Sequence, residues 1–90
     1  MFINLIQNAT NREAIERLFK LMLTKDEHNA INGRVAIAKA LIDGNESQRE
    51  IATRLGVSIA TVTRGSNNLK SMSDDERDFL IQAIQAVHNE

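Results

Sequence analysis

Residues 48–64 read QREIATRLGVSIATVTR, and this stretch decides the fold. Ile51 and Leu55 lie one helical turn apart, as inward positions of a first short helix, and Val62 is the inward residue of a second. Gly56 between the two helices can adopt the positive φ of a tight turn. Two helices joined in this way are typical of a helix-turn-helix, which places its second helix in the major groove of DNA.

The flanking positions of this motif agree with that interpretation. Ala52 is small enough for a close helix crossing, Val57 is placed to fill the space beneath the turn, and Ser58 is a typical N-cap. Small residues let a helix approach base edges, and Thr hydroxyls can bond bases or phosphates. The expected outward side chains of the second helix are small, hydroxylated or basic, and they are Ile59, Ala60, Thr61, Thr63 and Arg64.

The rest of the chain also predicts helices. Apolar residues recur every three or four positions, and no stretch alternates as a strand would. We expect helices at about 2–9, 11–23, 25–43, 48–55, 59–70 and 74–88. Four Ser/Thr-x-x-Glu capping boxes mark helix starts, namely Thr10 with Glu13, Thr24 with Glu27, Ser47 with Glu50, and Ser73 with Glu76. The sequence therefore predicts an all-α fold.

The length of 90 residues indicates one helical domain over 1–90, with the helix-turn-helix at about 48–70. So small a domain buries only about two-thirds of its unfolded surface. Two arrangements can cover the remaining apolar stripes. One is a monomeric bundle, and the other is a homodimer formed by about 2–43 and 74–88, with Phe2, Phe19 and Phe79 as anchors.

Composition excludes several classes of protein. The chain has no Cys, so disulfides, Cys-ligated zinc and thiol catalysis are excluded. No apolar run approaches the roughly 18 residues of a membrane span, and no secretory signal is evident, so we expect a cytoplasmic protein. His28 and His88 are expected to face solvent, and no nucleophile–base pair or metal spacing occurs. We therefore expect neither an enzyme nor a metal site.

The net charge of −1 conceals an uneven distribution of charge along the chain. Residues 34–70 hold six basic and three acidic residues, a net +3, whereas residues 71–90 hold one basic and five acidic residues, a net −4. Residues 1–33 are neutral. The basic segment contains the helix-turn-helix, so a protein of low net charge can still attract phosphate there.

Several stretches beyond the generic motif make the sequence recognisable. They are Leu21-Met22-Leu23-Thr24, Gln48-Arg49-Glu50, the run IATVTRGSN at 59–67, and Leu69-Lys70. Together they closely resemble the tryptophan (trp operon) repressor family, over nearly the whole chain from about Phe2. The resemblance implies an intertwined homodimer of six helices per chain, which binds L-tryptophan as corepressor and then operator double-stranded DNA.

The resemblance also implies the roles of individual residues. In the family, the residue matching Arg64 pairs with the tryptophan carboxylate, and the residue matching Arg34 covers the indole. The residues matching Leu21, Leu23 and Thr24 come from the partner chain, receive the ammonium group and close the pocket. Arginines and backbone carbonyls suit a zwitterion with a flat aromatic body.

Two further positions, Gly65 and Asn68, complete the implied corepressor site. A glycine inside a helix costs about 1 kcal/mol against alanine, and we interpret Gly65 as room for a ligand lying against the backbone. Better-known members of the family have Ser in place of Asn68, and Lys in place of Ala52. By match to the family's motif, the DNA-binding residues are Gln48, Arg49, Ile59, Ala60, Thr61, Thr63 and Lys70.

Two rival functions remain. One is a transposase-type helix-turn-helix domain that binds DNA without sensing an amino acid, and the other is a helical dimerisation module that binds no nucleic acid. The run TRGSN at 63–67 and the element LMLT at 21–24 argue against the transposase type.

Overall fold

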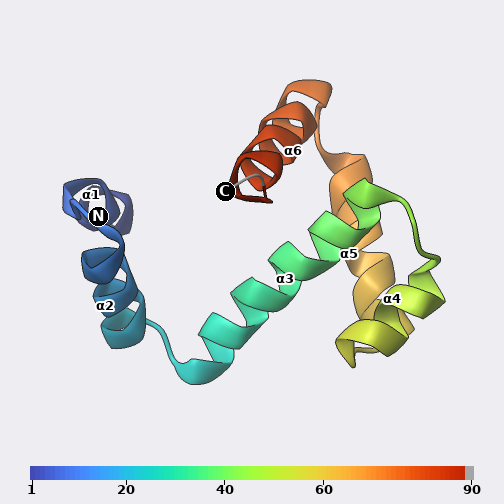
Figure 1. The fold of residues 1–90 in the computed structure, drawn as a ribbon, viewed down its shortest axis with the longest axis horizontal. Helices are drawn as coiled ribbons and strands as arrows, with labels where there is room; N and C mark the ends of the chain where they lie inside the picture. The colour runs from blue at the N-terminus through green and yellow to red at the C-terminus, as the bar shows by residue number, and fades with distance from the viewer. Residues whose placement is uncertain (89–90) are drawn as a thin grey trace. The chain divides into compact units, whose positions relative to one another are not determined.

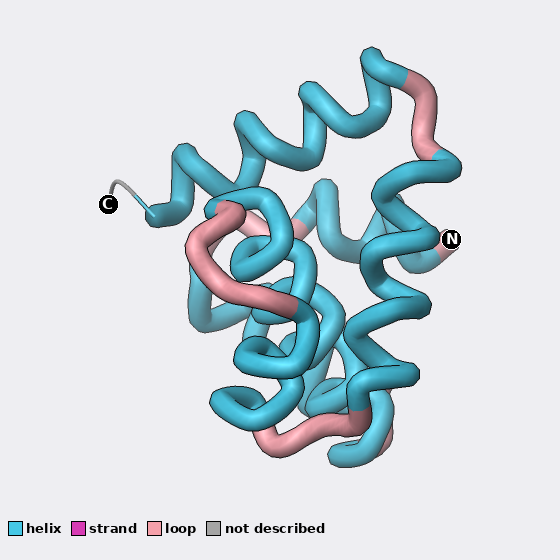
Figure 2. Tube along the Cα trace, turned by 90° about the vertical axis from the view of Figure 1, so that its right-hand side faces the viewer, coloured by secondary structure: helices cyan, strands magenta, loops and turns pink. Residues whose placement is uncertain are grey.

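A computed structural model describes the backbone of residues 1–88 and the side chains of residues 1–87, so the solvent-facing position expected for the His88 side chain lies outside the described residues. The helices are α1 (Phe2–Asn8), α2 (Arg12–Met22), α3 (Lys25–Asp43), α4 (Gln48–Leu55), α5 (Ile59–Ser71) and α6 (Asp74–His88) (Figure 1). Along the described trace the remaining segments are loops and turns, with no strand (Figure 2). The predicted all-α fold is confirmed, and no helix end differs from its expected position by more than one residue.

Three of the four predicted capping boxes form. They are Thr24 with Glu27, Ser47 with Glu50, and Ser73 with Glu76. The box predicted for Thr10 and Glu13 is wrong, because α2 begins one residue later than that box requires. Asn11 is the cap, and its Oδ1 accepts from the backbone N–H of Ala14 at 2.9 Å. Glu13 is therefore the second residue of the helix, whereas a capping box needs Glu at the third.

The described chain forms two compact units, Met1–Asn32 and a second that begins at Gly33. In the first unit the rings of Phe2 and Phe19 lie 5.9 Å apart between centroids, and the exposed His28 meets Phe19 edge-on at 6.3 Å. No residue of this first unit is buried. The side chains that pack between its helices are therefore only half-buried.

The second unit has a small core at the helix-turn-helix. The side chains of Ile51 and Val62 are completely buried, between α4 and α5, which lie against each other (Figure 1). Ile37, Ala40 and Ala52 complete the core, and Leu41, Leu55 and Val57 pack against it. Gly56 ends α4 with φ +69°, in the left-handed conformation that a turn of this kind requires. The inward residues predicted from the sequence are thus confirmed, and they fix α5 on α4.

Candidate functional site

The N-terminal end of α5 is organised by Ser58. Its Oγ accepts from the backbone N–H of Thr61 at 3.1 Å and lies 2.8 Å from Thr61 Oγ1. This cap ends the turn and leaves Ile59, which is 45% exposed, and Ala60 on the surface. An exposed, small and apolar first turn allows close approach to the edges of bases and to thymine methyl groups.

The two threonines of α5 are half-buried, so their predicted outward placement is only partly right. The hydroxyl of Thr63 donates to Gln48 Oε1 at the start of α4, with an O–O distance of 2.8 Å. Thr61 Oγ1 accepts from Arg64 Nη2 at 3.2 Å, one turn along α5. Both hydroxyls are therefore used within the helix-turn-helix itself, which the period of a single helix cannot reveal.

Ion pairs divide the basic residues of segment 34–70 into two groups. Lys39 Nζ lies 2.9 Å from Asp43 Oδ2, and Arg54 holds Glu46 through two nitrogens, Nε to Oε2 at 2.9 Å and Nη2 to Oε1 at 2.7 Å. The hydrogen bonds from Arg54 lower the pKa of the Glu46 carboxyl. Of the basic residues of segment 34–70, those without a carboxylate partner in the described structure are Arg34, Arg49, Arg64 and Lys70.

The end of α5 is held by Arg77 of α6, a residue that the sequence interpretation counted only as a charge. Its Nε and Nη2 donate to the carbonyl oxygen of Leu69 at 3.2 and 3.1 Å, and Nη2 also donates to that of Met72 at 3.1 Å. Nη1 donates to Asp74 Oδ1 at 3.2 Å. A cation shortly after a helix end, where unpaired carbonyls need donors, is the sequence signal that could have found it. Arg77 thereby joins α6 to the turn that carries Lys70.

Gly65 faces the second half of α3. A Cβ at this position would lie 2.7 Å from Cγ2 of Ile37 and 3.7 Å from Cδ1 of Leu41. Real Cβ atoms do not approach that closely, so the crossing of α5 over α3 requires the absence of a side chain. The sequence interpretation explained this glycine by a ligand alone, and the structure adds helix packing as a second reason.

The remaining corepressor candidates of the second unit are on the surface. Arg34 lies on α3, and Arg64 and Asn68 lie one turn apart on α5, all three exposed. The side-chain amide of Asn68 makes no hydrogen bond within the described residues. The backbone carbonyl of Asn68 accepts from Ser71 Oγ at 2.8 Å. These polar groups remain available to a ligand.

The other three corepressor candidates belong to the first unit. Leu21 is 77% exposed near the end of α2, and Leu23 is the C-cap of that helix, its N–H bonded to the carbonyl of Phe19. Thr24 Oγ1 accepts from the backbone N–H of Glu27 at 3.1 Å. In return the backbone N–H of Thr24 donates to Glu27 Oε1 at 2.9 Å, and this bond to the carboxylate lowers the pKa of Glu27. The seven candidates are therefore divided between the two compact units, three in the first and four in the second.

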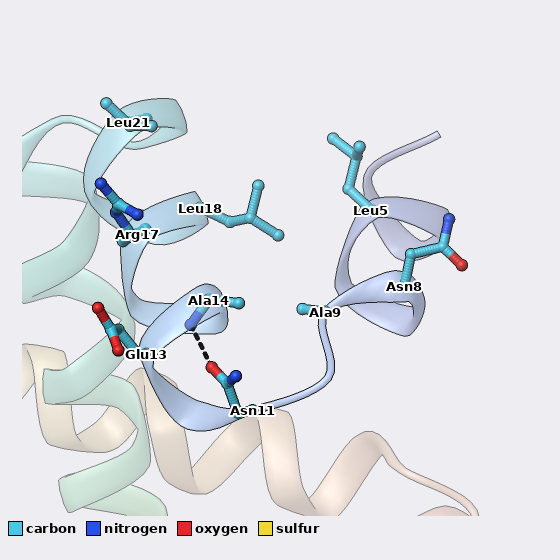
Figure 3. A pocket seen from close by; sticks show the side chains of 9 residues that line it. All are labelled: Leu5, Asn8, Ala9, Asn11, Glu13, Ala14, Arg17, Leu18 and Leu21. Carbon is cyan, nitrogen blue, oxygen red and sulfur yellow. Dashed lines mark hydrogen bonds between the residues drawn. The ribbon is translucent and has the colours of Figure 1, made fainter.

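A hollow of about 580 Å³ lies in the first unit, between α1 and α2 (Figure 3). Leu5 and Leu18 project into it from the two helices, and Asn11 closes one end through its bond to the N–H of Ala14. Of the seven corepressor candidates only Leu21 lines it. The hollow is mostly apolar and open, which suits an apolar side chain better than a zwitterion.

Other kinds of site find little support in the described part of the chain. No three side chains of His, Cys, Asp or Glu are grouped so that they could hold a metal ion there. None of the described helices has the length and apolar character needed to cross a membrane.

Comparison with known proteins adds independent evidence. Residues 1–84 match the family model described as Trp repressor protein. A relative from Vibrio cholerae serotype O1, named Trp operon repressor homolog, is 45% identical over 82 residues, which cover 91% of this chain and 80% of the relative. Relatives of the same name are 43% identical in Aliivibrio salmonicida, over 90% of this chain and 75% of the relative, and 44% identical in Vibrio campbellii, over 87% and 78%.

Proposed function

Because this chain belongs to the Trp repressor family, we propose that it is a transcriptional repressor that binds operator DNA when L-tryptophan is bound. Members of this family are regulatory DNA-binding proteins and not enzymes. The observation that carries the proposal is the packed helix-turn-helix of α4 and α5, which displays Arg49, Arg64 and Lys70 without carboxylate partners in the described residues.

DNA binding rests on the surface of this motif. The first turn of α5, with exposed Ile59 and Ala60, fits the floor of a major groove. Arg49 lies at the start of α4 and Lys70 in the last turn of α5, and we assign both cations to the phosphates that border the groove. Gln48, Thr61 and Thr63 complete the candidate DNA contacts.

Tryptophan recognition is assigned to arginines with no acidic partner in the described structure. Arg64 donates only a long bond to Thr61, so its guanidinium can take a carboxylate in a two-pronged contact. Arg34 is exposed on α3 and can lie over a flat ring. Gly65 adds no side chain on α5, and Asn68 supplies an amide in the next turn. These residues fit an amino acid with an aromatic side chain.

A homodimer is the arrangement that best covers the first unit. That unit has no buried residue, and its apolar side chains line an open hollow. Phe79 on α6 is also 77% exposed. Burial against a second copy removes this apolar surface from water at about 25 cal/mol per Å². In the dimer, Leu21, Leu23 and Thr24 of the partner chain would close the tryptophan site.

The mechanism that follows is a shift of population in the cytoplasm, where the tryptophan pool acts as the signal. We call the helix-turn-helix of α4 and α5 in each chain its reading head. Without tryptophan, the two reading heads of the dimer are mobile or wrongly spaced. Tryptophan between α3 and α5 fixes them about one helical turn of DNA apart, so that both enter successive major grooves. The ligand shifts this equilibrium only by the difference between its affinities for the two states.

A DNA titration with and without L-tryptophan tests the proposal. The probe is the promoter region of the trp operon from the same organism, with a scrambled duplex as control. We expect tryptophan to tighten binding to the promoter by at least about tenfold, a coupling of 1.4 kcal/mol. Equal binding without tryptophan would favour the transposase-type rival, and no binding to either duplex would favour the dimerisation module.

The variant Arg64→Ala tests the carboxylate assignment. We expect it to abolish the heat of L-tryptophan binding in calorimetry, because a buried carboxylate without its cation is strongly disfavoured. Arg54→Ala is the matched control, since Arg54 lies on α4 and is already paired with Glu46. Unchanged affinity in Arg64→Ala would refute the assignment.

A further inference from the structure

The hydrogen bond between Thr63 and Gln48 joins the two helices of the reading head. The residues are 15 positions apart, and Thr63 Oγ1 lies 2.8 Å from Gln48 Oε1. Both side chains are half-buried, so neither is free to rotate as a surface side chain would. Gln48 is the first residue of α4, directly after the cap Ser47 and directly before Arg49. The bond thus fixes a polar group at the edge of the reading surface.

Counting hydrogens distinguishes the two partners. A threonine hydroxyl has one hydrogen, and Thr63 donates it to Gln48. The non-bridging oxygens of a DNA phosphate only accept hydrogen bonds. While its hydroxyl donates to Gln48, Thr63 therefore has no hydrogen left to donate to a phosphate oxygen.

Gln48, in contrast to Thr63, keeps hydrogens that it can donate to a phosphate. Its Oε1 is occupied by Thr63, and this fixes which end of the carboxamide faces the core of the motif. Its Nε2 carries two hydrogens and has no hydrogen-bond partner among the described residues. An amide nitrogen with two available hydrogens, next to the cation of Arg49, is well suited to a phosphate oxygen.

We propose that Thr63 is a positioning residue, which contacts no phosphate itself but orients the Gln48 carboxamide so that Nε2 donates to the DNA backbone. This inference rests on the proposed DNA binding. It changes the role that the family motif gave to Thr63 and assigns the phosphate contact to Gln48. The contact is independent of base sequence, so it contributes to binding on any duplex.

A double-mutant cycle separates positioning from direct contact. The four proteins are wild type, Thr63→Val, Gln48→Ala and the double variant. The probe is a random duplex of about 30 base pairs, long enough for two successive major grooves, at low salt with saturating L-tryptophan. We expect Thr63→Val to weaken binding about fivefold, the value of one ordinary hydrogen bond. Gln48→Ala should weaken binding at least as much, and the double variant no more than Gln48→Ala alone.

Two further variants control for chemistry and for fold. Thr63→Ser keeps the hydroxyl and should bind DNA within about twofold of wild type. Thr53→Val removes a hydroxyl of the same kind from α4, where it donates only to the carbonyl of Arg49 at 3.0 Å, and should leave DNA affinity unchanged. In NMR spectra, the Gln48 side-chain amide signals should shift on addition of DNA in wild type and not in Thr63→Val.

The possible outcomes are distinct. If the losses of Thr63→Val and Gln48→Ala multiply in the double variant, Thr63 contacts the DNA by itself and the inference is wrong. The inference is equally wrong if Thr63→Val binds like wild type, or if the Gln48 amide signals of wild type do not respond to DNA. Failure of wild type to bind any duplex would instead overturn the proposed function, and the inference with it.

Discussion

The helix-turn-helix and the N-terminal helix pair solve the problem of burial in different ways. Ile51 and Val62 are completely buried between α4 and α5, against Ile37 and Ala40 of α3. In α1 and α2 no side chain is buried, and apolar residues line an open hollow. The reading head thus has a core within one chain, whereas the apolar face of the N-terminal helices stays exposed in the single chain.

This difference matches the roles proposed for the two regions. A surface that reads DNA needs fixed spacing between its side chains, and a small dry core supplies it. A region that joins two copies needs the opposite, an apolar surface left open in the single chain. In the proposed homodimer, the N-terminal helices would therefore gain their stability mainly from the partner chain.

The largest expected effect is from Leu18→Glu, which places a charge in the hollow between α1 and α2. Burying an unpaired carboxylate at an interface costs about 3–5 kcal/mol, so the dimer should dissociate at micromolar concentration. Sedimentation velocity should give the mass of a single chain. Circular dichroism should still show the helices of the second unit, and loss of all helix would contradict the independence of that unit.

Gly65→Ala is expected to destabilise the protein by about 1–2 kcal/mol, although alanine is the better helix former. The new methyl group would lie 2.7 Å from Ile37 Cγ2. Gly33→Ala in α3 is the matched control, because a Cβ there meets nothing within 4 Å, and it should stabilise the helix. Urea denaturation measures both. Equal effects of the two substitutions would show that the α3–α5 crossing is looser than the structure indicates.

The ion pairs predict which cations bind DNA. Arg49→Gln should lower the slope of log affinity against log salt by about 1, because it removes one phosphate contact. Arg54→Gln should leave the slope unchanged, since Arg54 is paired with Glu46 by two hydrogen bonds. Titrations of a random duplex at several salt concentrations give both slopes. A fall in slope for Arg54→Gln would mean that DNA draws Arg54 away from Glu46.

The smallest effect concerns acid stability. The pKa values of Glu46 and Glu27 are lowered in the folded chain, by hydrogen bonds from Arg54 and from Thr24. Their contribution is therefore present above the ordinary carboxyl pKa and is lost as the pH falls through the lowered values. Glu46→Gln should make the stability curve slightly flatter below about pH 4.5. Urea midpoints between pH 3 and pH 7 measure this, and a curve parallel to that of wild type would contradict the assignment.

Local features of this fold could be predicted from the sequence. The inward residues Ile51 and Val62, the caps Ser47 and Ser58 and the turn at Gly56 depend on neighbours a few residues away, and all are confirmed. The cap of α2 was misplaced because Asn11 and Thr10 are both good caps and only the path of the chain decides between them.

Contacts between distant residues could not be predicted. Three such contacts depend on how the helices cross. They are the hydrogen bond from Thr63 to Gln48, the close approach of Gly65 to Ile37, and the hydrogen bond from Arg77 to the carbonyl of Leu69. Periodicity gives the face of a helix but not the partner of each side chain. The corepressor residues were assigned from the family resemblance, whereas the outward residues of α5 also followed from the pattern of the helix-turn-helix.

The most direct test of this account is calorimetric titration of L-tryptophan into wild type and into Leu18→Glu. If the site is completed by Leu21, Leu23 and Thr24 of the partner chain, wild type should bind one tryptophan per chain. Leu18→Glu, which keeps Arg34 and Arg64 intact, should show affinity at least about tenfold weaker, a loss of 1.4 kcal/mol. Absence of heat with wild type, or equal affinity in both proteins, would contradict a tryptophan-dependent repressor built across two chains.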